Sequence, residues 1–280
     1  MTLGPENHDR DAAGLRYVYP VVSRRSGGVS VGINLNPNNA CNWRCVYCQV
    51  PGLVRGKAPA IDLAELEREL HVLLEPIVHG DWLARHAPQG ARRLNDVAFS
   101  GNGEPTSARE FPAAVALARR VLRAFGCEAS TELVLITNGS LVHRAEVQAG
   151  LRELARGRGQ VWFKLDRATD AGMRAVNDAA PGLARVRANL RSACALAPTW
   201  IQTCLFARDG APPDENELAA LLEFLTQELG PAGPRGVLLY GLARPSHQPE
   251  APTLARLPSE FLESFATRLR ARGLDTRVFP

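Results

Sequence analysis

The chain has 280 residues, of which 45% are hydrophobic and 22% charged, and its formal net charge is +4. A chain of this size and composition can bury a substantial core, as one α/β domain or as two smaller domains. The weak positive charge permits a nucleic-acid partner but does not require one. No apolar run reaches the roughly 18 residues of a membrane span, and residues 1–14 lack a signal-peptide core. We therefore expect a cytoplasmic protein without membrane contact.

An alternation of strands and helices begins at residue 29, after a polar segment, residues 1–28, that we interpret as an N-terminal arm. Residues 29–36 are β-branched with period two, which predicts a strand, and residues 62–78 have apolar residues at helical spacing behind an Asp. In chain order, the pattern predicts strand 29–36, helix 62–78, strand 94–100, helix 108–126, strand 132–138, helix 141–157, strand 160–166, helices 169–177 and 182–197, strand 199–206, helix 215–230, strand 236–242 and helix 259–273.

The predicted strands are almost wholly apolar, and amphipathic helices separate them. This arrangement indicates a parallel sheet that is buried on both faces, with about six βα units in one domain, residues 29–280. A closed eight-stranded barrel would need two more strands, so the sheet is either an open, doubly wound sheet or an incomplete barrel. In both cases, ligands bind at the carboxyl ends of the strands.

Three of the six cysteines lie within eight residues, in the loop after the first predicted strand: Cys41, Cys45 and Cys48. In a reducing compartment, clustered cysteines bind metal or do chemistry more often than they form disulfides. Their spacing lets one tight loop wrap a compact inorganic core, and iron–sulfur clusters select thiolate ligands. Three cysteines leave one iron of a four-iron cluster open, as a catalytic site requires.

A structural zinc site is the alternative interpretation of these cysteines, and such a site is closed by four protein ligands. No other Cys or His stands at the spacing of a zinc finger or zinc ribbon. His71 lies inside a predicted helix, and Cys127, Cys194 and Cys204 form no second pair of ligands. The spacing therefore favours the iron–sulfur cluster.

The sequence CNWRCVYC, residues 41–48, resembles the CxxxCxxC loop of the radical S-adenosylmethionine (SAM) enzymes, including the aromatic residue before the third cysteine. The resemblance implies that Cys41, Cys45 and Cys48 hold a [4Fe-4S] cluster whose fourth iron binds the amino group and carboxylate of SAM. One electron from an external reductant such as flavodoxin or ferredoxin splits the sulfonium, and a 5′-deoxyadenosyl radical takes a hydrogen atom from the substrate. We then expect a partial (β/α)6 TIM-like barrel of mostly parallel strands with outer helices.

The sequence FSGNGEPT, residues 99–106, ends the second predicted strand with two glycines and a carboxylate. A glycine-rich strand exit lets the backbone approach a ligand closely, although an ordinary turn before a helix has the same composition. The segment resembles the GGE motif of radical SAM enzymes, which binds the amino group of SAM. The resemblance makes Gly101, Asn102, Gly103 and Glu104 candidate cofactor-binding residues. Asn102 replaces the middle Gly, and Asn tolerates a positive φ better than most residues do.

Polar residues also end the next two predicted strands. Asn138 is either a contact to SAM or part of an Asn-Gly turn. Lys164 and Asp166 lie on one side of their strand, and burying both charges is costly unless they pair or meet a ligand. We interpret them as catalytic residues near the reacting centre, with a surface ion pair as the alternative. Residues 242–249 are Pro-rich and basic, and form a substrate loop or a plain connection.

The combined motifs predict a radical SAM enzyme whose substrate is unidentified. The motifs most resemble the small proteins related to the tRNA wyosine synthases, so an RNA base is a candidate substrate. Wyosine synthases carry a second cluster on upstream cysteines, whereas no cysteine precedes Cys41 here. One alternative is a non-catalytic iron–sulfur protein for electron transfer or redox sensing, although a carrier normally saturates its cluster with a fourth Cys. Another alternative is an α/β hydrolase or isomerase that has no cluster.

Overall fold

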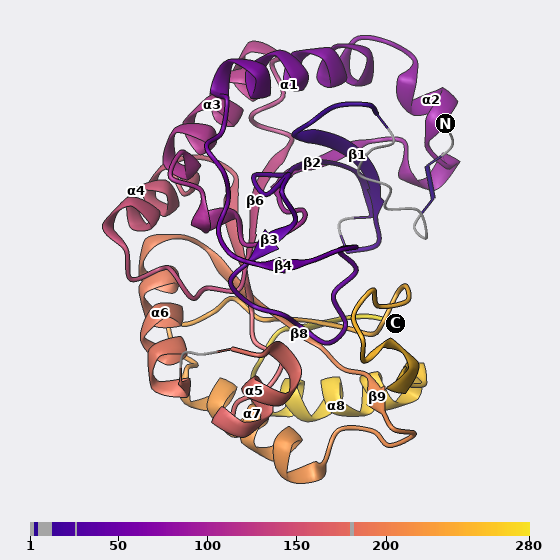
Figure 1. The fold of residues 1–280 in the computed structure, drawn as a ribbon, viewed down its shortest axis with the longest axis vertical. Coiled ribbons are helices and arrows are strands. Elements are labelled where there is room, and N and C mark those ends of the chain that lie inside the picture. The colour runs from indigo at the N-terminus through magenta and orange to yellow at the C-terminus, as the bar shows by residue number, and fades with distance from the viewer. Residues whose placement is uncertain (1–2, 5–12, 26, 180–181) are drawn as a thin grey trace. The chain divides into compact units, whose positions relative to one another are not determined.

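The computed structural model describes residues 3–4, 13–25, 27–179 and 182–280 (Figure 1). The chain divides into two compact units. The first consists of residues 1–42, 56–136 and 144–160, and the second of residues 43–55, 137–143 and 161–280. Part of the predicted N-terminal arm, namely residues 1–2, 5–12 and 26, lies outside the described residues.

The first unit is built on strands that follow one another in the order β1-β2-β5-β6. The first pair is antiparallel, and the two following pairs are parallel. These strands are β1 (Val18–Ser23), β2 (Gly28–Ile33), β5 (Leu94–Phe99) and β6 (Glu132–Thr137). Helices α1, α3 and α4 pack side by side (Figure 1). The helices are α1 (Leu63–Val78), α2 (Trp82–His86), α3 (Phe111–Ala124) and α4 (Ala145–Leu154), with 3-10 turns η1 (Gln89–Ala91) and η2 (Pro105–Ser107).

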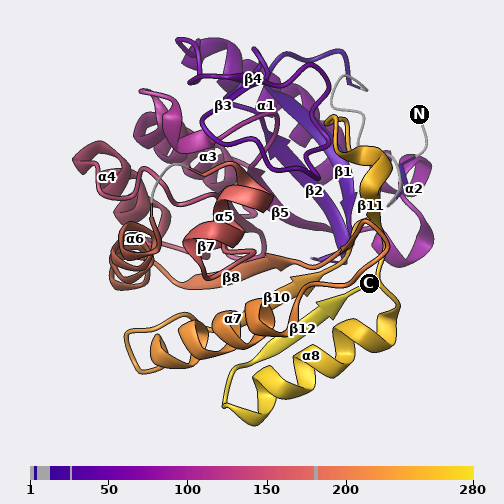
Figure 2. The ribbon, with the colours of Figure 1, turned by 60° about the horizontal axis from the view of Figure 1, so that its bottom comes forward.

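The second unit contains strands in the order β7-β8-β10-β12, all parallel. They are β7 (Gly159–Lys164), β8 (Thr199–Cys204), β10 (Val237–Tyr240) and β12 (Thr276–Phe279). Helix α8 lies along β10 and β12 (Figure 2). The helices are α5 (Asp170–Asn177), α6 (Leu183–Leu196), α7 (Glu215–Gln227) and α8 (Ser259–Ala271). The remaining elements are short: β3 (Ala40–Cys41), β4 (Val54–Arg55), β9 (Ala207–Arg208), η3 (Ala251–Thr253) and β11 (Leu254–Ala255).

The strands and helices predicted from residue 29 onward occur at the predicted places, with ends that differ by a few residues. Every residue of β2 and of β8 is buried, as expected for parallel strands covered on both faces. Helix α1 begins at the predicted Asp, because the Asp62 carboxylate accepts the N–H groups of Ala64 and Glu65. Among the helices of the described residues, none has the length and apolar character of a membrane span.

Two strands of the eight-stranded order, β1 and β12, are absent from the predicted set, as are the four two-residue strands. Strand β1 contains Pro20, a residue that argues against a central strand but is tolerated at a sheet edge. In the strand order, β1 stands first and β12 last, so each pairs on one side only. The segment predicted as an arm therefore includes an edge strand, Val18–Ser23.

Candidate functional site

In the first unit, asparagines at the end of β2 organise the neighbouring turns. The Asn34 side-chain oxygen accepts the N–H groups of Asn36, at 3.0 Å, and of Asn102, at 3.1 Å. The Asn36 amide donates to the carbonyl of Ala40, at 2.9 Å. These bonds tie the exit of β5 to the exit of β2, directly before Cys41. Neither Asn34 nor Asn36 was a predicted site residue, since their partners follow no local sequence pattern.

The two glycines of the GNGE segment are required by close packing. Gly101 has φ of 130°, and a Cβ there would lie 2.6 Å from the Asn34 side-chain oxygen. A Cβ on Gly103 would overlap the carbonyl oxygen of Ala40. Backbone cannot move aside as a flexible side chain can, so a larger residue would displace the segment that leads into Cys41.

The structure corrects one expectation for this segment. The residue with positive φ is Gly101, while Asn102 is not among the residues with positive φ, so the predicted reason for Asn at this position is wrong. Asn102 instead donates its amide to Asn39, at 2.6 Å, and Asn39 itself has φ of 55°. The Asn at position 102 therefore contributes a hydrogen bond within the unit, which Gly could not make.

Glu104 is buried and begins the 3-10 turn η2. One carboxylate oxygen of Glu104 accepts both the N–H of Thr106, at 3.1 Å, and its hydroxyl, at 2.5 Å. These bonds fix the orientation of the carboxylate at the exit of β5. A contact between Glu104 and SAM stays a prediction.

Asn138, in the second unit, forms the Asn-Gly turn that was the alternative to a ligand contact. Its side-chain oxygen accepts the N–H and the hydroxyl of Ser140, at 3.0 and 2.7 Å. Gly139 has φ of 70°, and the ring of Phe163 fills the space of a Cβ. The turn accounts for the Asn-Gly sequence, and a contact of Asn138 with SAM stays a prediction.

The cysteine loop is divided between the two units. Cys41 ends β3 in the first unit, whereas Cys45 and Cys48 lie in the segment 43–55 of the second. All three have intermediate exposure, and none forms a disulfide among the described residues. The N–H of Cys48 donates to the carbonyl of Cys45, at 2.9 Å, so the second and third cysteines lie on one tight turn.

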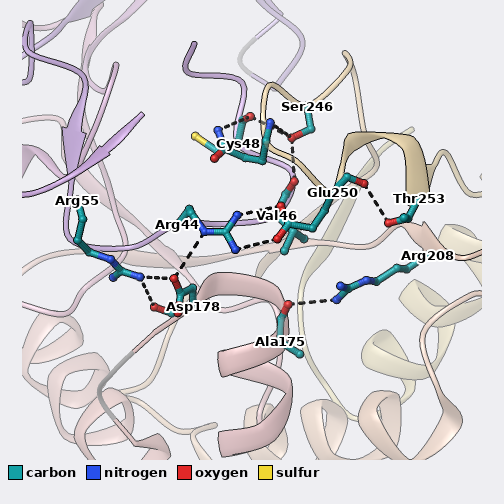
Figure 3. A network of polar contacts seen from close by, with 11 residues as sticks. Arg44, Val46, Cys48, Arg55, Ala175, Asp178, Arg208, Ser246, Glu250 and Thr253 are labelled. Carbon is teal, nitrogen blue, oxygen red and sulfur yellow. Dashed lines mark hydrogen bonds and ion pairs between the residues drawn. The ribbon is translucent and has the colours of Figure 1, made fainter. Parts of the chain in front are cut away.

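A segment distant in sequence holds this turn. The Ser246 hydroxyl contacts the carbonyl oxygens of Val46, at 2.8 Å, and Cys48, at 3.2 Å, and the N–H of His247 donates to the same Cys48 carbonyl, at 2.9 Å (Figure 3). Residues 242–249, predicted as a substrate loop or a connection, thus bind the backbone of the cysteine loop. The sequence carries no signal for this pairing.

Two arginines that flank the cysteine turn in the sequence form ion pairs with distant carboxylates (Figure 3). Arg44 forms two hydrogen bonds with the Glu250 carboxylate, at 2.8 and 2.7 Å, and lies 3.6 Å from Asp178. Arg55 pairs with Asp178 as well. The hydrogen bond to Glu250 raises the pKa of Arg44, and the same bond lowers the pKa of Glu250. Both groups are therefore charged at neutral pH.

Asp166 is buried and accepts hydrogen bonds from three directions. One of its oxygens accepts the Tyr47 hydroxyl, at 2.5 Å, and the Asn177 amide, at 2.7 Å. The other accepts the N–H of Cys204, at 2.9 Å, and the Lys164 ammonium lies 3.8 Å from the first oxygen. Lys164 and Asp166 lie together, with Asp166 buried and Lys164 partly exposed, which differs from the alternative of a surface ion pair; their catalytic role stays a prediction.

Lys164 lies among aromatic rings. Its ammonium donates to the Tyr240 hydroxyl, at 3.0 Å, and is 4.7 Å from the centre of the Tyr47 ring. Burial lowers the pKa of Lys164 and is the largest single effect, but the charge interactions around the ammonium, that with Asp166 first, together outweigh burial, and the pKa lies well above its ordinary value. Lys164 therefore carries a positive charge at neutral pH, and cation–π contact with the Tyr47 ring stabilises that charge.

The donor set of the loop suits a four-iron cluster. In such a cluster each thiolate binds a different iron, so the sulfurs need not converge on one point. Within the described ranges, no three His, Cys, Asp or Glu side chains converge as a single-ion site requires. Burial raises the pKa of the Cys45 thiol to about 12, against the opposing charge of Lys164, so binding of iron would release a proton.

Gln202 is a further polar residue on the sheet of the second unit. It stands beside Lys164 in the register of β7 and β8 and is 1% exposed. Its side-chain nitrogen has no hydrogen-bond partner among the described residues. Buried donors are rarely left without a partner, so this amide is available to a bound ligand.

No protein-family model matches the sequence. A curated relative, the GTPase Obg of Brachyspira hyodysenteriae, is 25% identical over 132 residues, which are 47% of this chain and 17% of that protein. A phosphate-binding loop of the G-x-x-x-x-G-K-[ST] type is absent from the sequence, because Ala58 follows Lys57 and Leu165 follows Lys164, the chain's two lysines. The match therefore carries no nucleotide-binding site to this chain.

Solved structures resemble the chain over most of its length. A radical SAM methyltransferase from Sphaerobacter thermophilus matches with a TM-score of 0.58 and 18% identity, over 90% of this chain and 66% of that one, just under two thirds. The chain has the radical SAM fold. A structure of TYW1 with a lysine–pyruvate adduct bound matches with a TM-score of 0.53 and 14% identity, over 89% of this chain and 74% of that one. The radical SAM fold confirms the predicted fold class, a partial (β/α)6 barrel of mostly parallel strands.

Proposed function

We propose that the protein is a radical SAM enzyme in which Cys41, Cys45 and Cys48 hold a [4Fe-4S] cluster. One observation carries the proposal: the CxxxCxxC sequence follows β2 on a chain that has the radical SAM fold. When bound, the cluster supplies one electron to the sulfonium of SAM, which yields methionine and a 5′-deoxyadenosyl radical that takes a hydrogen atom from the substrate. The electron comes from an external donor of the flavodoxin or ferredoxin type.

The proposed SAM contacts are the GNGE segment and Asn138. Glu104 is positioned by Thr106 to accept hydrogen bonds from the amino group of SAM, since an ionised carboxylate is a strong acceptor for an ammonium group. Gly101 and Gly103 present backbone at the exit of β5, where a larger residue would displace it. Asn102 and Asn138 complete the proposed set of cofactor-binding residues.

We propose that Lys164 and Asp166 lie near the reacting centre with different roles. Asp166 already accepts hydrogen bonds at both oxygens, which favours a role in orienting its neighbours. The raised pKa of Lys164 keeps its amine protonated, so it can stabilise negative charge or donate a hydrogen bond.

The substrate is not identified, and we propose an RNA base as the first class of substrate to test. The support for RNA is the motif resemblance to the wyosine-synthase-related proteins, together with a modestly positive net charge of +4. Incubation of the reduced enzyme with SAM and either bulk tRNA or no RNA tests this class. A base modification found by nucleoside mass spectrometry only in the complete reaction would support it.

Production of 5′-deoxyadenosine tests the proposed function directly. The protein is reconstituted with iron and sulfide without air, reduced with dithionite and mixed with SAM, and the products are measured by mass spectrometry. We expect roughly four irons per chain and formation of 5′-deoxyadenosine and methionine. Cys45→Ala should lose the iron and the product with the fold retained, as circular dichroism would show, because Cys45 is only partly buried and packs against a core cluster without being part of it.

Cys194→Ser is the matched control, since Cys194 lies on α6, away from the cysteine loop, and should keep both iron and product. A wild-type protein that binds iron but forms no 5′-deoxyadenosine would point to electron transfer or redox sensing. A protein without iron or sulfide would contradict the cluster altogether. Normal iron content in Cys45→Ala would contradict the assignment of that ligand.

A further inference from the structure

The side chain of Asn177, the last residue of α5, lies between Cys45 and Asp166. Its amide nitrogen is 3.3 Å from the Cys45 sulfur and 2.7 Å from an Asp166 oxygen, and Asn177 is 1% exposed. A side-chain amide has two N–H donors, so it can serve both acceptors at once. Tyr47 also donates to the same Asp166 oxygen, which therefore acts as an acceptor and requires that the nitrogen of Asn177 face it.

Main-chain hydrogen bonds fix Asn177 relative to the cysteine. The N–H of Arg44 donates to the carbonyl of Asn177, at 3.1 Å, and the N–H of Val46 donates to the carbonyl of Val176, at 2.9 Å. Arg44 and Val46 flank Cys45 in the sequence. These two bonds fix the backbone of Asn177 beside that of the cysteine turn, and the bond to Asp166 orients its side-chain amide.

The residue after Asn177 stabilises this arrangement. Asp178 ends α5 in the left-handed conformation, with φ of 48° and ψ of 41°, and its N–H donates to the carbonyl of Arg174. Its carboxylate pairs with Arg44 and Arg55, on both sides of the cysteine turn (Figure 3). The end of α5 is thus attached to the loop through backbone and side chains alike.

We propose that Asn177 donates an N–H···S hydrogen bond to the Cys45 thiolate and thereby raises the reduction potential of the cluster. This inference rests on the proposed function, because it requires the cluster. Reduction adds negative charge to the cluster and its sulfur ligands, so a donor at the sulfur stabilises the reduced form more than the oxidised form. Burial strengthens the bond because little water competes for it. Asn177 acts through Cys45 and eases entry of the electron that cleaves SAM.

Asn177→Leu tests the inference, since Leu has a similar size and no donor. The variant is reconstituted in the full chain, its iron content is measured, and the cluster is titrated against redox mediators without SAM. We expect full iron content and a lower potential, with the reduced-to-oxidised ratio at a fixed applied potential falling about tenfold, a shift of about 59 mV for one electron. The Fe–S(Cys) stretching band in resonance Raman spectra should move to higher frequency, because the sulfur loses a hydrogen bond. Asn177→Ser, which is smaller than Asn, repeats the comparison if the Leu variant folds poorly.

Tyr47→Phe is the matched control. Both variants remove one donor from the same Asp166 oxygen, but only the Asn177 variant removes the donor to sulfur. We expect the potential of Tyr47→Phe to stay near that of the wild type. Iron-loaded Asn177 variants with the wild-type potential, or an equal shift in Tyr47→Phe, would overturn this inference alone. Failure of the wild type to bind iron would overturn the proposed function and this inference together.

Discussion

At the scale of single residues, the GNGE segment combines two features: closely packed glycines and an oriented, buried carboxylate. Its glycines are needed because Asn34 and the carbonyl of Ala40 occupy the space of a side chain at positions 101 and 103. Glu104 follows directly and is oriented by the first turn of η2. Close packing alone thus accounts for the glycines, and the proposed binding of SAM would use the backbone that this packing fixes.

Replacement of Gly103 measures the strength of that constraint. Gly103→Ala should lower the free energy of unfolding by about 1–3 kcal/mol, because the new Cβ meets backbone that cannot move aside. Gly90→Ala is the control, since nothing lies within 4 Å of a Cβ there and no positive φ is involved. Urea denaturation of both variants makes the comparison. Equal stability of the two variants would show that the backbone at Ala40 moves to accommodate a side chain at position 103.

The sequence predicts site residues that local patterns mark, and it misses those that only tertiary contacts bring in. The spacing of the cysteines and the period-two pair Lys164 and Asp166 are visible in a short window. Asn177 is not, because it is 132 residues from Cys45 in the chain and ends an ordinary short helix. Such partners can be found only when the loop and the helix are seen together.

At the scale of elements, helix α1 anchors strand β1 through one buried carboxylate. Glu69 accepts the N–H groups of Arg16, Tyr17 and Val18, at 2.7, 2.7 and 3.1 Å. An ionised acceptor makes stronger hydrogen bonds than a neutral one, and these donors are largely shielded from water. The Glu69 carboxylate thus stabilises β1, an edge strand that pairs with another strand on one side only.

Glu69→Gln should therefore destabilise the first unit. The Gln side chain turns either a neutral oxygen or an N–H group toward the donors, and we expect a loss of about 2–3 kcal/mol in the free energy of unfolding. Glu67→Gln is the control on the same helix, because Glu67 forms an exposed ion pair with Arg120 and its loss should cost less than about 1 kcal/mol. Similar midpoints in urea for the two variants would argue against the anchoring role.

At the scale of the whole molecule, alternating strands and helices suffice to predict the fold class. Strands such as β2 and β8, buried along their whole length, can be predicted from the sequence because apolar, β-branched and small residues dominate them. Edge strands β1 and β12 carry weaker patterns: one contains Pro20, and the other is a short stretch, Thr276–Phe279, at the end of the chain. Edges need less apolar surface, so sequence periodicity marks them poorly.

The loop after β10 stabilises the cysteine turn from the far end of the chain. Ser246→Ala removes a hydroxyl that contacts the carbonyls of Val46 and Cys48. We expect amide hydrogen exchange in residues 44–50 to accelerate about 2- to 10-fold, the value of one hydrogen bond, with no change in α1. Ser192→Ala is the control, because that hydroxyl donates to the Ala188 carbonyl within its own helix. Unchanged exchange in residues 44–50 would contradict the stabilising role.

The separation between these partners also sets an order of events during protein synthesis. Ser246 follows Val46 by 200 residues, so at ordinary elongation rates the cysteine turn leaves the ribosome roughly 10–40 s before the segment that holds it. Until then its thiols belong to an unfinished nascent chain. The cysteine turn consequently lacks its contacts with Ser246 until that later segment has been synthesised.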